Sequence, residues 1–353
     1  MVWHLKAIAC SPLGTRTLQQ GIYCRHLLRL AARASLIAWT ALISLPQPFS
    51  LCIAQTTSIA DRPVPDPYVL RVDAELVVLS ATVLNSHHAL VPGLTAQDFS
   101  IYEDGTLQHL KNFSHDDLPA TVGILVDNSG SMSAKRDDVI AASMTFARSS
   151  NPQDEMFVIH FNDDVRFGLS EGLPFTDQSK YLQQALMGIR AIGQTSLYDA
   201  IIAGLKHLTL GVRDKKVLIL ITDGGDTASK ATLQQVIAAA RQSAAILYVV
   251  AIFDDQDGDQ NPEVLKQLTK QTGGEAYFPT TSQEIASICE GIAHAIRVQY
   301  TLTYSPTAIA HDGRYRSVVV RANAHGQHLT VRTRAGYMVP LEPTASTNKA
   351  HQP

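Results

Sequence analysis

The chain has 353 residues, of which 45% are hydrophobic and 17% charged, a composition typical of globular rather than disordered proteins. This length is sufficient for two or three domains. The formal net charge of −3 argues against a nucleic-acid partner.

The first 54 residues form a basic and then apolar segment that predicts a secretory signal peptide. The segment has no acidic residue, and its basic residues are Lys6, Arg16, Arg25, Arg29 and Arg33. The apolar run over residues 35–45 is too short to span a bilayer as a helix but has the length of a signal-peptide core. Small residues favour cleavage near Ala54 or Ala60. We therefore expect export to the periplasm, the cell surface or the medium. An uncleaved membrane anchor is the alternative.

Cysteine usage agrees with removal of this leader. Cleavage would leave a more acidic chain with Cys289 as its one cysteine, so the mature chain would have no internal disulfide. Cys52 is a candidate lipid-anchor residue, but Leu51 precedes it where a small residue is expected. We expect membrane contact only through the signal or such an anchor. The oligomeric state is not indicated.

After the leader, residues 55–66 form a Pro-rich linker and residues 67–116 a small β unit. The stretch "YVLRVDAELVVLSATVL" predicts one or two strands, and "DFSIYEDG" predicts a short strand ending in a turn at residues 103–105. The stretch "LQHLKNF" predicts one further strand. These strands are too few to be stable alone.

Residues 119–295 show a different pattern, in which apolar strands alternate with amphipathic helices. Strands are expected in "ATVGILVD", "EMFVIHFND", "VRFGLSEGL", "KKVLILITDGGD", "AILYVVAIFDD" and "EAYFP". Helices are expected in "RDDVIAASMTFARSS", "SKYLQQALMGIRAI", "SLYDAIIAGLKHLTL", "ATLQQVIAAARQSA", "PEVLKQLTKQTGG" and "SQEIASICEGIAHAIRV". The alternation is typical of the α/β class, with a doubly wound, mostly parallel sheet covered by helices on both faces.

Residues 297–340 return to a β pattern, with predicted strands in "VQYTLTYSP", "YRSVVVRANA" and "LTVRTRAGYMV". We expect them to complete one β-sandwich with residues 67–116, so that the α/β domain is inserted between the two halves. Residues 341–353 are expected to be disordered.

Oxygen-bearing side chains gather where the predicted parallel strands end. They are Asp127, Ser129 and Ser131 in "VDNSGSM", Thr195 in "GQTSLYDA", and Asp223 and Asp226 in "TDGGD". The carboxyl ends of parallel strands form one edge of a sheet, which is where open sheets bind ligands. Taken singly, these residues could be helix caps or turn residues. Their common position instead predicts a single site.

The residue types at this site favour a hard divalent cation. Mg²⁺ takes six oxygen ligands in near-octahedral geometry, and Mn²⁺ or Ca²⁺ could use the same oxygens. The absence of neighbouring His or Cys disfavours zinc and copper. Because few of the ligands carry charge, the ion would remain electrophilic. We expect it to accept a carboxylate, from Asp or Glu of a partner protein, as its last ligand.

A second acidic segment, "FDDQDGD", follows another predicted strand. Asp255, Asp257 and Asp259 alternate as in a calcium loop, but Gln260 stands where an EF-hand requires glycine. We interpret the segment as a solvated rim with a secondary role at the metal site, as we do Asp226. Calcium binding is the alternative.

The segments "VDNSGSM", "GQTSLYDA" and "TDGGD" resemble, in order, the three parts of the metal-ion-dependent adhesion site of von Willebrand factor type A (VWFA) domains. The resemblance covers residues 119–295. It implies that Mg²⁺ is held, in part through water, by Asp127, Ser129, Ser131, Thr195 and Asp223. The flanking β segments are similar to those of VWFA-related exported proteins common in acidobacteria. The implied function is cation-dependent adhesion or scaffolding.

Two alternatives remain at this stage. A metal-dependent hydrolase could use the same site, with His160 at the end of a predicted strand as the candidate base. The chain contains no phosphate-binding Gly-Lys loop and no His-Glu-x-x-His helix, so we expect no enzyme activity. The other alternative makes the metal structural and the β-sandwich the interaction surface.

Overall fold

The computed structural model describes residues 76–341, except 189, 254–259, 308–310, 325 and 327. The predicted signal peptide, the linker and the tail after residue 341 lie outside the described residues. So does the acidic segment with Asp255, Asp257 and Asp259. Among the helices of the described part, none combines the length and apolar character needed to cross a membrane.

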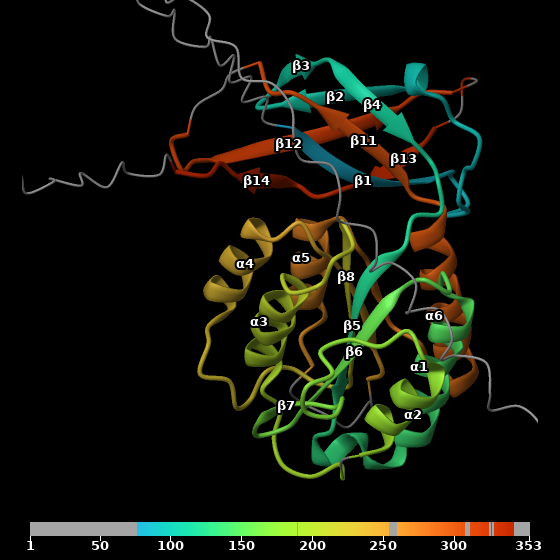
Figure 1. Ribbon diagram of the computed structural model, residues 1–353, viewed down its shortest axis with the longest axis vertical. Coiled ribbons are helices and arrows are strands. Elements are labelled where there is room, and N and C mark those ends of the chain that lie inside the picture. The colour runs from blue at the N-terminus through green and yellow to red at the C-terminus, as the bar shows by residue number, and fades with distance from the viewer. Residues whose placement is uncertain are drawn as a thin grey trace, which may run out of the picture. The chain divides into compact units, whose positions relative to one another are not determined.

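A six-stranded sheet forms the centre of the α/β domain, with strand order β10-β9-β8-β5-β6-β7 (Figure 1). Its strands are β5 (Ala120–Asp127), β6 (Glu155–Phe161), β7 (Val165–Phe167), β8 (Lys215–Thr222), β9 (Ile246–Ala251) and β10 (Ala276–Tyr277). All neighbours pair in parallel except β7, which is antiparallel to β6. Every residue of β5 is buried, as its continuous apolar sequence requires in a sheet covered on both faces.

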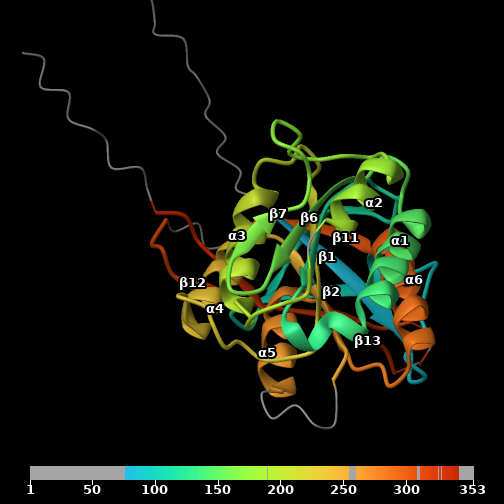
Figure 2. The ribbon, with the colours of Figure 1, turned by 90° about the horizontal axis from the view of Figure 1, so that it is seen from below.

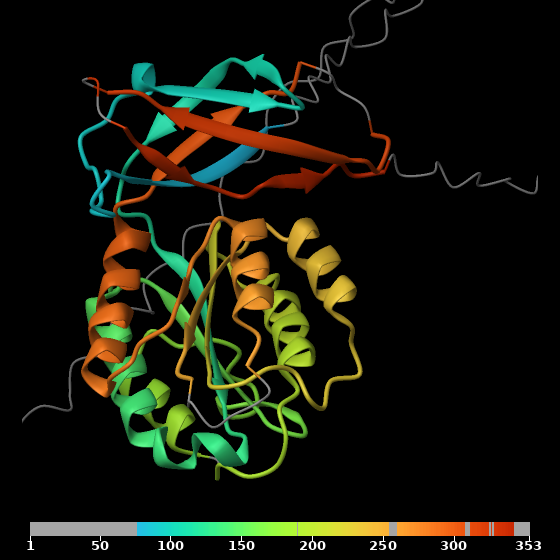
Figure 3. The ribbon, with the colours of Figure 1, turned by 180° about the vertical axis from the view of Figure 1, so that it is seen from behind.

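Six helices cover this sheet and confirm the predicted α/β fold. They are α1 (Arg136–Ser149), α2 (Ser179–Met187), α3 (Leu197–Leu208), α4 (Leu233–Gln242), α5 (Pro262–Thr272) and α6 (Ser282–Arg297). Helices α1, α2 and α6 pack on one face, and α3, α4 and α5 pack on the other (Figures 2 and 3). The predicted second helix is shorter than expected, because α2 ends at Met187 and a loop follows from Gly188.

Two four-stranded sheets make up the β-sandwich, in the orders β13-β1-β11-β4 and β14-β12-β2-β3. The strands before the α/β domain are β1 (Val77–Leu84), β2 (Phe99–Glu103), which follows the 3₁₀ helix η1 (Ala96–Asp98), β3 (Thr106–Gln108) and β4 (Leu110–Ser114). Those after it are β11 (Tyr300–Tyr304), β12 (Tyr315–Ala322), β13 (Thr330–Arg332) and β14 (Gly336–Met338). Strand β1 pairs with β11, and β2 pairs with β12. Both sheets therefore combine the two flanks, as the insertion hypothesis predicts.

Two single-strand predictions in the sandwich are wrong. The stretch "LQHLKNF" divides into β3 and β4, and "LTVRTRAGYMV" divides into β13 and β14, with each pair split between the two sheets. Alternation continues across such a corner, so it does not reveal that the chain changes sheets. The predicted turn at residues 103–105 is present as a tight hairpin. Asp104 and Gly105 have φ of 46° and 79°, the left-handed pair that joins strands closely.

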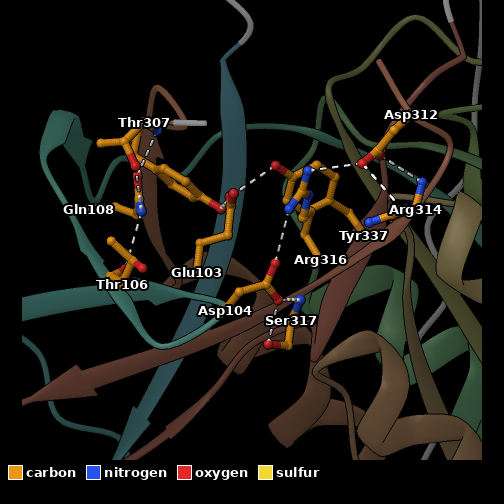
Figure 4. A network of polar contacts seen from close by, with 11 residues as sticks. Glu103, Asp104, Thr106, Gln108, Thr307, Asp312, Arg314, Arg316, Ser317 and Tyr337 are labelled. Atoms are coloured by element: carbon orange, nitrogen blue, oxygen red, sulfur yellow. Dashed lines mark hydrogen bonds and ion pairs between the residues drawn. The ribbon is translucent and has the colours of Figure 1, made fainter. Parts of the chain in front are cut away.

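Polar contacts around this hairpin connect the two sheets of the sandwich (Figure 4). Buried Glu103 accepts hydrogen bonds from the hydroxyls of Tyr304 in β11, at 2.6 Å, and Tyr337 in β14, at 2.9 Å. Asp104 accepts bonds from the backbone and side chain of Ser317, at 2.9 and 3.0 Å, and the backbone bond in particular lowers the pKa of its carboxyl. Side chains that precede the inserted α/β domain in the sequence are therefore hydrogen-bonded to residues that follow it.

Candidate functional site

The segment after β5 forms the 3₁₀ helix η2 (Gly130–Ala134) before α1 begins at Arg136. Ser129 occupies the N-cap position of η2, but its side chain makes no capping hydrogen bond. Its hydroxyl lies 3.2 Å from the hydroxyl of Ser131 instead. The side chain of Ser129 therefore does not cap η2, and both hydroxyls lie at the carboxyl edge of the sheet.

The two predicted carboxylate ligands are brought to the same edge by adjacent strands. Asp127 ends β5 and Asp223 follows β8, and each is 1% exposed. The Ser129 backbone N–H donates to Asp127 Oδ1 at 2.8 Å, and Ser131 Oγ donates to Asp223 Oδ1 at 3.0 Å. Four of the five predicted ligands thus form one connected group. Ser131 is exposed, so the group is open to solvent on one side.

Asp127 is a buried carboxylate with a second carboxylate, Asp223, nearby. Burial raises the pKa of its carboxyl to about 6, although hydrogen bonds from Thr222 Oγ1 at 2.6 Å and from Ser129 favour the ionised form. The nearby charge of Asp223 raises this pKa further. A bound cation would reverse both unfavourable effects, because it compensates the lost hydration and the repulsion between the carboxylates.

The loop with Thr195 lies directly beside η2. Gly130 N–H donates to Gly193 O at 3.1 Å, and Ile192 N–H donates to Asn128 O at 2.9 Å. Thr195 is 6% exposed, and its backbone N–H donates to Thr227 Oγ1 at 2.9 Å. It does not cap α3, since Ser196 holds the N-cap position. The backbone contacts therefore bring the loop that carries this fifth predicted ligand beside η2.

Two further candidates have other partners. Asp226 Oδ1 accepts a hydrogen bond at 3.1 Å from Tyr198 N–H in the first turn of α3, so this carboxylate satisfies one of the free N–H groups of the helix terminus. His160 is buried, with Nδ1 at 2.8 Å from Asn128 Nδ2 and Nε2 at 2.6 Å from Ala185 O. Burial lowers the pKa of the His160 imidazole. Both ring nitrogens are thus engaged away from the serine hydroxyls.

Lys135 is a site residue that the sequence analysis missed. It lies between η2 and α1, and its ammonium donates to Asp223 Oδ2 and to Ile252 O, both at 3.0 Å. A lysine at the start of a helix normally extends into solvent, so no pattern in the sequence distinguished it. The pairing becomes visible only when β5, β8 and β9 are placed side by side.

The spacing of the candidate ligand oxygens matches the geometry that Mg²⁺ requires. Ligands at 2.0–2.1 Å in octahedral array lie about 3 Å from their neighbours. The oxygen pairs Ser129–Ser131 and Ser131–Asp223, at 3.2 and 3.0 Å, have this spacing. Within the described residues, no group of three or more His, Cys, Asp or Glu could hold a metal. An ion at this edge would therefore depend on the hydroxyls, and the residues fit that arrangement.

Comparison with known proteins defines the class of the α/β domain. Residues 121–290 match the sequence model of the von Willebrand factor type A domain. The chain therefore contains a domain of this family, and its mostly parallel sheet with helices on both faces is the VWA-type fold. The search of curated protein sequences gave no match.

Several solved structures are similar to this chain. A von Willebrand factor type A protein from Catenulispora acidiphila shares 12% identity, with 77% of this chain and 75% of that chain covered and a TM-score of 0.46. An aerotolerance-related membrane protein from Bacteroides fragilis shares 18% identity over 50% of this chain and 98% of its own, with a TM-score of 0.40. The PilB minor pilin from Streptococcus sanguinis shares 13% identity over 52% and 62%, with a TM-score of 0.41.

Proposed function

We propose that this protein is an exported binding module that captures a partner protein through a divalent cation. The preferred cation is Mg²⁺, and it is held by Asp127, Ser129, Ser131, Thr195 and Asp223. The observation that carries the proposal is the run of oxygens at the carboxyl edge of the sheet, spaced 3.2 and 3.0 Å apart. Domains of the VWA family are commonly protein-interaction modules, which supports the same conclusion.

The side chains of the site favour binding of an acidic partner residue. When bound, the cation supplies an electrophilic centre that accepts a carboxylate oxygen from Asp or Glu. The two serines contribute neutral oxygens, and the Asp223 carboxylate is already paired with Lys135. The low negative charge leaves attraction for a further carboxylate. Exposure of Ser131 gives the partner access to this edge.

We infer that the site binds rather than catalyses. A hydrolase would need a general base within reach of the substrate or a metal-bound water. His160 is the candidate base in sequence, and its contacts with Asn128 and Ala185 argue against that role. We further propose export, on the strength of the basic and apolar leader over residues 1–54.

Isothermal titration with Mg²⁺, Mn²⁺ and Ca²⁺ tests the metal site. The unsubstituted protein should bind saturably, and Asp127→Ala should not. Asp164→Ala removes an exposed carboxylate paired with Arg166 and is the matched control, with unchanged binding expected. Circular dichroism checks that Asp127→Ala is folded, and Asp127→Asn replaces it where folding is impaired. Absence of saturable binding to the unsubstituted protein contradicts the proposal.

Activity and partner assays separate binding from hydrolysis. A panel of phosphate and ester substrates should give no metal-dependent turnover. Turnover that disappears in Asp127→Ala would favour the hydrolase. Capture of a purified partner should require the divalent ion, be abolished by chelator and fail with Asp127→Ala. Capture that persists in chelator would instead favour the β-sandwich as the interaction surface.

A further inference from the structure

The ammonium of Lys135 is in direct contact with one carboxylate of the candidate metal site. It is 3.0 Å from Asp223 Oδ2 and also donates to Ile252 O at 3.0 Å, so two bonds fix its position. The side chains of Lys135 and Asp223 are 18% and 1% exposed. A pair with this little solvent contact is weakly screened, so its charges act strongly on the rest of the site.

The two oxygens of Asp223 have different partners. Oδ1 accepts from Ser131 Oγ and faces the hydroxyl group, whereas Oδ2 accepts from Lys135 Nζ. The oxygen cluster and the ammonium thus share one carboxylate. With Asp127 as the second carboxylate, the site has two acidic groups and one basic group of its own. A divalent ion that binds through Oδ1 enters a site in which half the acidic charge is already balanced.

We propose that Lys135 is an internal counter-ion of the metal site, which balances Asp223 in the ion-free protein and opposes the divalent ion that binds there. This inference rests on the proposed metal function and concerns its regulation. Lys135 preserves the fold of the site at low cation concentration and raises the concentration at which the site fills. Partner capture would then respond to the divalent-ion level around the exported protein.

The direction in which the metal affinity changes when Lys135 is removed distinguishes a counter-ion from a residue that only positions Asp223. If Lys135 only oriented Asp223, its removal would disorder a ligand and weaken metal binding. As a counter-ion, its removal leaves the site more negative. That change strengthens divalent-ion binding and destabilises the ion-free protein, because a buried carboxylate loses its partner.

Lys135→Met in the full chain tests this, because methionine keeps much of the side-chain length without the charge. Titration calorimetry with Mg²⁺ should show affinity at least about tenfold higher than that of the unsubstituted protein. In EDTA, the midpoint of thermal unfolding should fall by about 5 °C or more, and saturating Mg²⁺ should restore it. Equal or weaker Mg²⁺ affinity, or an unchanged midpoint in EDTA, overturns the proposal.

Two further variants complete the experiment. Lys266→Met removes a lysine paired with Glu263 on the surface of α5, where both side chains are more than half exposed, and should change neither measurement. Combining Lys135→Met with Asp223→Asn removes both charges and should recover stability in EDTA. If the double variant is no more stable than Lys135→Met, the loss comes from packing and the proposal is wrong.

The two proposals fail in different ways. If the unsubstituted protein binds no Mg²⁺ at accessible concentrations, the proposed function fails as stated. Lys135→Met still decides the counter-ion proposal in that case. Gain of saturable Mg²⁺ binding by the variant supports an ammonium that excludes the ion, and no gain overturns it.

Discussion

The hydroxyl of Ser131 donates a hydrogen bond to Asp223 Oδ1 across 3.0 Å, although the two residues lie 92 positions apart in the sequence. One follows β5 and the other follows β8, and these strands are neighbours in the sheet. The candidate site therefore exists only when the sheet is assembled. A substitution at the site should change the stability, the ion affinity or both, according to which atoms lose their partners.

Asp127 gives a prediction for pH dependence in the ion-free protein. Its pKa is raised from 3.8 to about 6, so the protonated carboxyl stabilises the fold below about pH 4 and this contribution is lost as the pH rises through 6. The free energy of unfolding should decrease by about 3 kcal/mol through this group. Urea unfolding in EDTA, from pH 4 to 7.5, measures it.

Asp127→Asn should remove this component and flatten the profile. Asp154, whose pKa burial also raises to about 6, is present in both proteins, so the difference between the two profiles isolates Asp127. If the free energy of unfolding changes with pH by the same amount in the two proteins, the prediction is contradicted. With Mg²⁺ added, the unsubstituted protein should instead lose ion affinity as the pH falls, since the ligand must be ionised.

Gly193 tests whether the Thr195 loop belongs to the site. Its φ is 89°, and a Cβ there would clash with the carboxylate of Asp163, which accepts a hydrogen bond from Gln194 N–H. Gly193→Ala should destabilise the protein by about 2 kcal/mol or more and weaken Mg²⁺ binding. Gly172→Ala is the control, because its φ is 83° but its Cβ would meet nothing within 4 Å.

For Gly172→Ala we expect the free energy of unfolding to fall by about 1 kcal/mol, from backbone strain alone, and the Mg²⁺ affinity to be unchanged. Urea unfolding and titration calorimetry provide the two measurements. If Gly193→Ala and Gly172→Ala have equal effects on ion affinity, the loop with Thr195 is not part of the ion site.

Tyr304 tests the connection between the two halves of the β-sandwich. Tyr304→Phe removes one of the two hydroxyls that satisfy buried Glu103 and should cost about 1–3 kcal/mol. Tyr181→Phe changes a side chain that is 42% exposed and should cost close to nothing. Mg²⁺ affinity should be unchanged in both. A loss of ion affinity in Tyr304→Phe would mean that the sandwich contributes to the metal site.

Sequence patterns were sufficient to predict the arrangement of strands that positions the site. Continuous apolar runs identified β5, β8 and β9 as buried parallel strands, and parallel strands necessarily place Asp127 and Asp223 at one edge. The pairing of the outer β segments also followed, because neither had enough strands to be stable alone. These inferences depend only on periodicity and chain direction.

Contacts between distant side chains could not be predicted in this way. Lys135 has the sequence context of a solvated lysine, and only the position of Asp223 shows its partner. Asp226 has the context of a site carboxylate, yet it binds the first turn of α3. The break between β13 and β14 was missed because period-two alternation is the same on both sides of a sheet corner.

Ser131 provides the most direct test of the hydroxyl ligands, because η2 contains a matched control. Ser131 and Ser133 are both exposed in this 3₁₀ helix, but only the hydroxyl of Ser131 contacts Ser129 and Asp223. Ser131→Ala should lower Mg²⁺ affinity by about tenfold or more, equivalent to about 1.4 kcal/mol, because an oxygen ligand is lost. Ser133→Ala should bind Mg²⁺ like the unsubstituted protein.

Stability in EDTA should fall by about 1–3 kcal/mol in Ser131→Ala, because Oδ1 of buried Asp223 loses its hydrogen bond, and should not change in Ser133→Ala. The Lys135 ammonium still pairs with Asp223 Oδ2 in Ser131→Ala, so we expect this variant to remain folded. The difference in Mg²⁺ affinity between the two folded variants therefore tests the Ser131 hydroxyl as an ion ligand. Equal Mg²⁺ affinities for Ser131→Ala and Ser133→Ala would remove Ser131 from the ligand set.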